Sequence, residues 1–298
     1  MVLPSWLERL TSIRDVKDVL LNGLECLIDC GNGLQQIRSP FASVESLSRA
    51  MIELAFECGA RLDIASPMLD LSIGTLRLHM LLPHGICVSP SLSIRVHSEN
   101  LLTLDQLHQR KMITSLQLQV IRKSLAERKT IVISGATSSG KTTLLRAMLA
   151  ECEERIVTIE QIPELFLAPP AVSLTAREKN QEGVGEITLS DLVIQSLRMR
   201  PDRIVVGEVR RDEFIAFLQA VSNGHSGSLT TLHASSIEQV PQRLILLGLL
   251  SGVSAQITEQ LVASSVDLVI QLERRSGFRQ LVAIAKPVLV GEKLQMVA

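Results

Sequence analysis

The segment 131–145 constrains the fold of this chain more than any other part of the sequence. It reads Ile-Val-Ile-Ser-Gly-Ala-Thr-Ser-Ser-Gly-Lys-Thr-Thr-Leu-Leu. Gly135 and Gly140 take the glycine positions of the phosphate-binding pattern G-x-x-x-x-G-K-[ST]. Lys141 and Thr142 complete that pattern. A β-branched apolar run precedes the loop and apolar residues follow it at helical spacing, so the sequence predicts a strand, a phosphate-binding loop and a helix in that order.

The chemistry of the loop follows from its residue types. Glycines let backbone N–H groups close around phosphate oxygens, and the N-terminus of the helix adds a favourable dipole. Lys141 is expected to reach the β- and γ-phosphates, and the Thr142 hydroxyl to ligate Mg²⁺. ATP and Mg²⁺ are therefore the expected cofactors. The residues predicted to bind the nucleotide in this loop are Gly135, Ala136, Thr137, Ser138, Ser139, Gly140, Lys141, Thr142 and Thr143.

The segment 204–208, Ile-Val-Val-Gly-Glu, is an apolar strand that ends in an acid. The carboxyl ends of parallel strands form the ligand crevice of an open sheet, so Glu208 is expected to face the γ-phosphate. Gly207 stands where an aspartate is common. Glu208 is then expected to serve Mg²⁺ through water, to polarise the attacking water, or both. The alternative is an exposed acid that merely closes a strand.

His225 and His233 are eight residues apart in the segment Gly-His-Ser-Gly-Ser-Leu-Thr-Thr-Leu-His. The period of two of an extended segment places both on one face, where they could monitor the γ-phosphate. The alternative is a structural role for each histidine. Metal binding is disfavoured, because no cysteine or third histidine is near them in the sequence.

The order of the expected elements indicates an α/β protein with a second, smaller domain. Residues 1–97 predict a small α+β unit, and residues 98–129 a linker and helical bridge. From residue 130 to 298, strands and helices alternate, as in a nucleoside-triphosphatase core built on a mostly parallel sheet. For residues 286–298 two readings stay open, an edge strand or an extension that binds a partner.

Composition narrows the functional classes. The net charge is −1 and only 2% of the residues are aromatic, so direct contact with nucleic acid is not expected. No apolar stretch reaches the length of a membrane span, and the N-terminus lacks the layout of a signal peptide. The five scattered cysteines indicate free thiols in a reducing compartment. A soluble intracellular protein is expected.

These motifs together resemble the secretion-superfamily ATPases of type II secretion, type IV pili and type IV secretion. The resemblance is strongest to the Tad/Flp pilus assembly ATPases, the CpaF-like branch, and it covers nearly the whole chain. Besides the phosphate loop, the segments that carry it are Val19–Gly23, Ser66–Asp70, Leu92–Arg95, Val157–Glu160 with Glu164, Gly183–Glu186, Leu197–Pro201, Val206–Arg210 and 224–234.

The resemblance implies a RecA-like P-loop ATPase core and a PAS-like N-terminal domain that closes over the nucleotide within a homo-hexamer. It places Glu160 and Glu164 in the family's acidic box, with Glu160 as a further metal ligand, and Glu208 in Walker B. By the same resemblance, His225 and His233 fall in its histidine box.

The resemblance also implies that certain arginines contact the phosphates with their positive charge. Arg77 and Arg95 match the phosphate-approaching arginines of the N-terminal domain. Arg177 matches a catalytic arginine near the subunit boundary. An arginine supplied by a moving domain couples the charge of the γ-phosphate to the position of that domain. For any single one of them the alternative is an exposed ion pair of little energetic value.

The sequence departs from the family pattern in the acidic region. The family's Glu-Asp pair is Glu160-Gln161 here, which removes one carboxylate. Ser173 stands where an arginine is often found, four residues before Arg177. The chain is also expected to lack the helical segment that usually precedes the N-terminal domain.

The function that these observations predict is a hexameric ATPase that hydrolyses Mg-ATP and drives assembly or retraction of a Tad/Flp-type pilus or a related secretion machine. The resemblance implies that it acts through an inner-membrane platform protein and lies at the cytoplasmic face of the membrane. Two alternatives stay open: a conjugation or competence ATPase, and a nucleotide-binding scaffold subunit that hardly turns over ATP.

Overall fold

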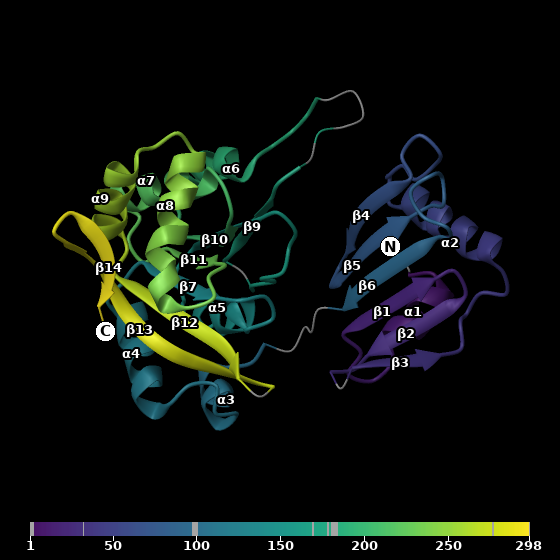
Figure 1. Ribbon diagram of the computed structural model, residues 1–298, viewed down its shortest axis with the longest axis horizontal. Coiled ribbons are helices and arrows are strands. Elements are labelled where there is room, and N and C mark those ends of the chain that lie inside the picture. Colours follow the sequence, from purple (N-terminus) through teal and green to yellow (C-terminus); the bar gives the residue numbers. More distant parts are fainter. Residues whose placement is uncertain are drawn as a thin grey trace. The chain divides into compact units, whose positions relative to one another are not determined.

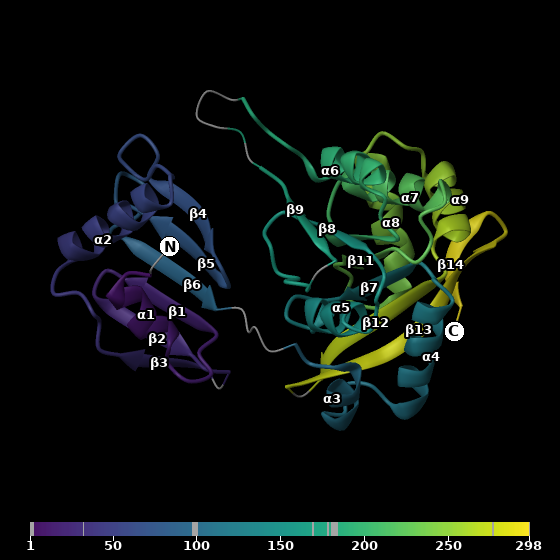
Figure 2. The ribbon, with the colours of Figure 1, turned by 180° about the vertical axis from the view of Figure 1, so that it is seen from behind.

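Two units with separate hydrophobic cores make up the part of the chain that the structure describes. The computed structural model describes residues 3–31, 33–96, 101–168, 170–177, 179, 184–275 and 277–297. Its two units are Met1–Glu99 and Asn100–Ala298. Figures 1 and 2 show the elements of each unit from opposite sides.

The N-terminal unit is an antiparallel sheet of six strands in the order β3-β2-β1-β6-β5-β4, with two helices packed on it. Alternation dictates its core: in β1, Val19 and Leu21 are buried while their neighbours are more exposed. A capping box between Ser43 and Ser46 starts α2. The bounds are β1 Asp18–Asn22, β2 Glu25–Asp29, β3 Leu34–Ile37, β4 Met68–Ile73, β5 Leu76–Leu81, β6 Ser91–Val96, α1 Ser5–Thr11 and α2 Val44–Glu57.

The second unit is built on a sheet of eight strands in the order β14-β13-β12-β7-β11-β10-β8-β9. The strands from β12 to β9 are parallel to one another, and β13 and β14 add an antiparallel edge. Their bounds are β7 Ile131–Gly135, β8 Ile156–Glu160, β9 Val172–Thr175, β10 Arg203–Val209, β11 Leu229–Leu232, β12 Leu268–Arg275, β13 Phe278–Val290 and β14 Lys293–Val297.

Helices cover both faces of this sheet, which explains why its central strands are apolar throughout. In β7, Ile131 and Ile133 pack with α3, α4 and α5, whereas Val132 packs on the other face with α6 to α9. The helices are α3 Leu104–Gln109, α4 Ser115–Ala126, α5 Lys141–Leu149, α6 Leu189–Ser196, α7 Glu213–Ser222, α8 Val240–Leu250 and α9 Ala255–Ser265, with short 3₁₀ turns η1 Leu197–Met199 and η2 Ile237–Gln239.

The segment 98–129, predicted as a bridge, lies within the second unit from residue 101 onward, and residues 98–100 lie outside the described residues. Its helices α3 and α4 bury Leu104 and Ile121 in the same core as β7. A capping box between Thr103 and Gln106 starts α3. The helical pattern is interrupted before α4, where Lys111 takes a positive φ.

Of the two readings of residues 286–298, the described part, to Val297, shows an edge strand. β13 turns back into β14, and the pair closes one side of the sheet. No single helix among the described residues is long and apolar enough to cross a membrane. The segments Ile237–Leu250 and Ala255–Ser265 reach that length and composition only as a pair bent by 120°.

Helices α8 and α9 meet at a glycine. A Cβ added to Gly248 would lie 2.7 Å from Cγ2 of Thr258 and would overlap its hydroxyl. Such a distance is shorter than real Cβ contacts allow, so glycine sets how closely the two helices approach.

We expect Gly248→Ala to destabilise the protein by about 1–3 kcal/mol, because the added methyl group overpacks this contact. Urea denaturation would show it as a lower transition midpoint. Thr258→Ala removes the hydroxyl and the methyl group that the new Cβ would meet, so the double variant should recover part of the loss. Additive losses in the double variant would contradict this contact.

Candidate active site

Strand β7 brings the glycine-rich loop to the carboxyl edge of the sheet, and α5 begins directly after it. Gly140, the residue before α5, has a φ of +100°, a conformation that favours glycine. A Cβ at Gly140 would also lie 2.9 Å from Cε of Met112. At Gly135 a Cβ would lie 2.6 Å from the carbonyl oxygen of Leu272. Both glycines of the pattern are therefore required by the backbone geometry.

Lys141 is buried, and its ammonium group lies inside the loop. Nζ donates to the carbonyl oxygens of Gly135 at 2.9 Å and Ala136 at 3.1 Å, and it lies 3.4 Å from Nδ1 of His233. Burial lowers the pKa of Lys141, and the carboxylate of Glu208 opposes that shift. The loop thus holds a positive charge beside its backbone N–H donors.

His233 connects this loop to the end of β10. It directly follows β11, which lies between β7 and β10, and its Nε2 lies 2.6 Å from Oε1 of Glu208. An ammonium group can only donate, so Nδ1 is the acceptor toward Lys141. On its other side the ring approaches Glu208 closely, although Oε1 of Glu208 accepts no hydrogen bond there.

Glu208 is held between two basic side chains. Its Oε2 accepts a hydrogen bond from Nη2 of Arg210 at 2.7 Å, opposite the contact with His233. Burial acts to raise the pKa of Glu208, but His233 and Arg210 outweigh it and bring the pKa down to about 2. The side chain is therefore an ionised carboxylate at physiological pH.

The turn after β10 is fixed by Glu213, at the start of α7. This carboxylate is buried and accepts backbone hydrogen bonds from Arg210 and, at 2.9 Å, from Arg211. It thereby sets the direction of the turn that carries Arg210 back toward Glu208. Neither Glu213 nor Arg210 is assigned a role by the sequence pattern. An acid three residues after a strand-end arginine is the signal that could indicate such a capped turn.

Glu160 lies at the end of β8, one strand away from Glu208, and is buried. Its carboxylate accepts backbone hydrogen bonds from Glu164 at 3.0 Å and Leu165 at 3.3 Å. Burial raises the pKa of Glu160 to about 7, although these two hydrogen bonds act in the opposite direction. Because both of its oxygens already accept backbone N–H groups, this geometry favours a role in shaping the turn over the predicted role as a metal ligand.

Gly207 explains why no aspartate stands before Glu208. A Cβ at this position would lie 2.9 Å from Cγ of Glu160 and 3.2 Å from its Oε1. The space that a larger residue would occupy is filled by the Glu160 side chain. Glycine at 207 and a buried glutamate at 160 therefore belong to one packing arrangement.

The donor set suits magnesium. Among the described residues no three His, Cys, Asp or Glu side chains gather into a metal-binding group. Magnesium bound with a nucleotide needs few protein ligands, since it uses one or two carboxylate or hydroxyl oxygens, phosphate oxygens and water. The half-buried Thr142 at the start of α5 and the ionised Glu208 provide oxygens of this kind.

The predicted pairing of His225 with His233 on one face is wrong. The segment between them is not extended throughout, because a turn at Ser226–Gly227 precedes β11. β11 runs parallel to β7, with Leu232 opposite Ser134, so His233 follows at the edge that carries the phosphate loop. His225 precedes the strand at the other edge, where its Nδ1 contacts the carbonyl oxygen of Ala220 at 3.1 Å.

Arg77 and Arg95 lie in the N-terminal unit as direct cross-strand neighbours on β5 and β6, so their side chains share one face. Asp18 on β1 is opposite Arg95 and accepts a hydrogen bond from its Nε at 3.0 Å. The two arginines therefore form a cationic pair beside one carboxylate.

Arg177 lies just beyond β9, at the edge of the sheet. It pairs with Ile187 in an isolated bridge, and its Nε donates to the carbonyl oxygen of Gly185 at 2.6 Å. Four strand spacings, roughly 19 Å, separate β9 from β7. The structure therefore does not bring Arg177 to the phosphate loop of its own chain, whereas it does bring together Lys141, Glu208 and His233.

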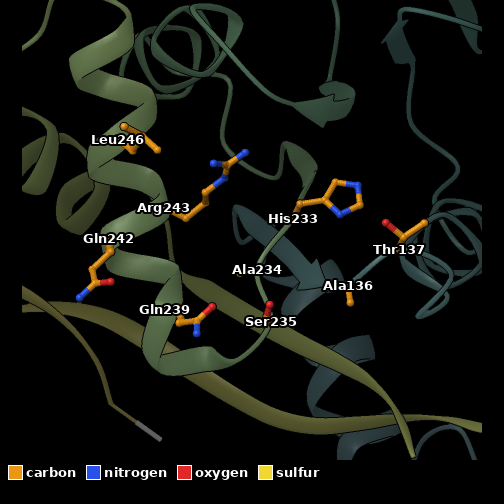
Figure 3. Close-up of a pocket in the computed structure, with 9 residues that line it drawn as sticks. All are labelled: Ala136, Thr137, His233, Ala234, Ser235, Gln239, Gln242, Arg243 and Leu246. Carbon is orange, nitrogen blue, oxygen red and sulfur yellow. The ribbon is translucent and has the colours of Figure 1, made fainter.

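A cavity of about 480 Å³ adjoins the phosphate loop (Figure 3). Its walls are Ala136 and Thr137 of the loop, the segment His233–Ser235 after β11, and one face of the start of α8. The ring of His233 points toward Thr137, on the side of the cavity away from α8 (Figure 3). A cavity of this size beside a phosphate loop is suited to part of a small-molecule ligand.

Comparison with known proteins decides the family. Residues 62–282 match the family described as type II/IV secretion system protein. The chain belongs to this family. A Mycobacterium tuberculosis protein provisionally named for conjugal transfer is 38% identical to this type II/IV secretion system protein over 291 residues, which cover 94% of this chain and 83% of the relative.

Solved structures confirm the predicted fold class, an α/β ATPase-type core with an N-terminal domain. The VirB11 ATPase of the Brucella suis type IV secretion system, in complex with sulphate, is 26% identical with a TM-score of 0.50, covering 94% of this chain and 93% of VirB11. The pilus retraction motor PilT with bound ADP shares the fold at 18% identity, with a TM-score of 0.67 and coverage of 100% and 84%.

We expect Glu160→Gln to change how the stability of this secretion-system protein depends on pH. The pKa of Glu160 is about 7 in the folded chain and about 4.3 in an unfolded one, so the folded state binds the extra proton. Its stabilising contribution is complete below about pH 4.3 and is lost as the pH rises through 7. The difference in Tm between Glu160→Gln and the wild type should therefore shift in favour of the variant from pH 5 to pH 8. A constant difference would contradict the raised pKa.

Proposed function

We propose that this protein hydrolyses Mg-ATP as the motor of a secretion or pilus machine. The observation that carries the proposal is the contact of His233 with both Lys141 and Glu208, at the edge where the phosphate loop ends. One cation for phosphate and one ionised carboxylate for water are thereby held at a fixed separation. Phosphoryl transfer depends mainly on such positioning and charge neutralisation.

In this proposal each residue has a defined task. The backbone of the loop and Lys141 bind the phosphates, and Thr142 with Glu208 holds Mg²⁺, which neutralises charge on the phosphate oxygens when bound. The ionised Glu208 orients the attacking water as a hydrogen-bond acceptor. His233 positions Glu208 through the close contact of its Nε2 with Oε1, and Glu160 positions the neighbouring turn. We assign no nucleotide contact to His225.

Arg77, Arg95 and Arg177 are proposed to act when subunits assemble into a homo-hexamer. Arg77 and Arg95 stand side by side on one sheet face, the arrangement needed to contact one phosphate group with two guanidinium groups. Arg177 is distant from the phosphate loop of its own chain, so we assign it to the site of a neighbouring subunit. Opening and closing of the N-terminal domain would then follow the charge of the nucleotide.

For the machine itself, two candidates have separate support. The ordered motifs resemble Tad/Flp pilus assembly ATPases, whereas the 38% identical relative is provisionally named for conjugal transfer. In both cases we propose action at the cytoplasmic face of the membrane through an inner-membrane platform protein, without direct contact with nucleic acid. Neighbouring genes for prepilins, or for relaxases and channel proteins, distinguish the two.

A weakly hydrolysing scaffold is the alternative within nucleotide binding. The loss of a carboxylate at Gln161 favours it, and the ionised Glu208 held by two basic side chains favours hydrolysis. Release of phosphate from ATP by the assembled protein, measured at steady state, decides between them.

We expect Glu208→Gln to retain ATP binding but to lower turnover roughly 100-fold or more, because the neutral amide cannot orient water as the carboxylate does. Lys141→Ala should lose binding as well, by about tenfold or more. Binding of a fluorescent ATP analogue and phosphate release measure the two effects. The exposed Glu153→Gln is the matched control and should leave both unchanged. Turnover near the wild-type rate in Glu208→Gln would contradict the proposal.

A further inference from the structure

The cavity beside the phosphate loop has a cation on the wall opposite the loop. Gln239, Gln242, Arg243 and Leu246 line it from α8 and the residue before it, at the spacing that places them on one helical face. Figure 3 shows the Arg243 side chain extending from α8 toward the segment that carries His233. Arg243 is the one arginine or lysine among the lining residues.

The guanidinium group of Arg243 has unused hydrogen-bonding capacity. Its Nε is buried and has no hydrogen-bond partner, and Arg243 forms no ion pair with any residue that the structure describes. A buried donor without a partner destabilises the protein, and a guanidinium group is best satisfied by a planar or tetrahedral oxyanion. A cation in this condition on a cavity wall indicates that the cavity receives an anion.

The position of the cavity identifies the anion. Ala136 and Thr137 follow the first glycine of the phosphate pattern, and His233 contacts Lys141, the residue expected to reach the β- and γ-phosphates. The cavity therefore adjoins the end of the loop at which the terminal phosphate lies, beyond the region that a diphosphate fills.

We infer that Arg243 binds the terminal phosphate of a nucleoside triphosphate and so distinguishes triphosphate from diphosphate. The inference rests on the proposed function, since it presupposes that the loop binds a nucleotide. Arg243 belongs to a different helix from the phosphate loop. The terminal phosphate thus joins α8 to the loop, and its loss releases that link while Lys141 still holds the diphosphate.

The test compares two nucleotides on the full-length protein. Equilibrium binding of a fluorescent ADP and of a fluorescent, non-hydrolysable ATP analogue is measured with Mg²⁺ for wild type, Arg243→Gln, Arg243→Lys and Arg110→Gln. Arg110→Gln is the matched control, because it removes the same charge from an exposed position of the same unit. We expect Arg243→Gln to weaken the triphosphate about tenfold or more and the diphosphate less than twofold. Arg243→Lys should recover part of the loss, and Arg110→Gln should match wild type.

Three results would overturn the inference. Equal weakening of both nucleotides in Arg243→Gln would show that Arg243 supports the fold of the site, and unchanged binding of both would show that it contacts neither. If inorganic phosphate tightened ADP binding in wild type but not in Arg243→Gln, while the triphosphate bound both equally, the anion would be free phosphate. A wild-type protein that binds neither nucleotide would overturn the proposed function itself, whereas retained ADP binding would leave it standing.

Discussion

The contact of one imidazole ring with two opposite charges underlies the rest of this site. The Nδ1 of His233 accepts from the Lys141 ammonium on one side, and its Nε2 lies 2.6 Å from the Glu208 carboxylate on the other. Three strands converge through it, because the loop follows β7, the histidine follows β11 and the glutamate ends β10. A parallel order of these strands is what makes their carboxyl ends meet, so the fold and the chemistry depend on the same topology.

Much of the fold could be predicted from the sequence, for reasons visible in particular elements. Capping boxes at Ser43 and Thr103 and the alternation in β1 are local features that neighbouring residues determine by themselves. Other elements depend on tertiary context. The helix α1 has only seven residues, too few for a clear period, and β13 and β14 are stabilised as strands by pairing at the sheet edge.

Some residues of the site could be predicted from the sequence and others could not. Lys141 and Glu208 could be predicted, because a sequence motif or the end of a predicted strand fixes their position. The prediction for His225 was wrong because it treated the eight residues to His233 as one extended segment. The turn at Ser226–Gly227 interrupts the alternation of side chains that an extended segment would have. Arg210, Glu213 and Arg243 have no motif, since their roles arise from a capped turn and from a helix that is distant in sequence. The match of residues 62–282 shows which family the chain belongs to.

The close approach at Gly248 has a mechanical consequence. Arg243 and Gly248 lie five residues apart on α8, so the helix that faces the phosphate loop is the one pressed against Thr258 of α9. Two helices without space between them cannot bend independently. Helix α9 is in turn linked to β14, because the Leu294 amide of β14 donates a hydrogen bond to Glu259 of α9. If Arg243 were displaced, α8 and α9 would therefore move together as one rigid body, and β14 at the antiparallel edge of the sheet would move with them.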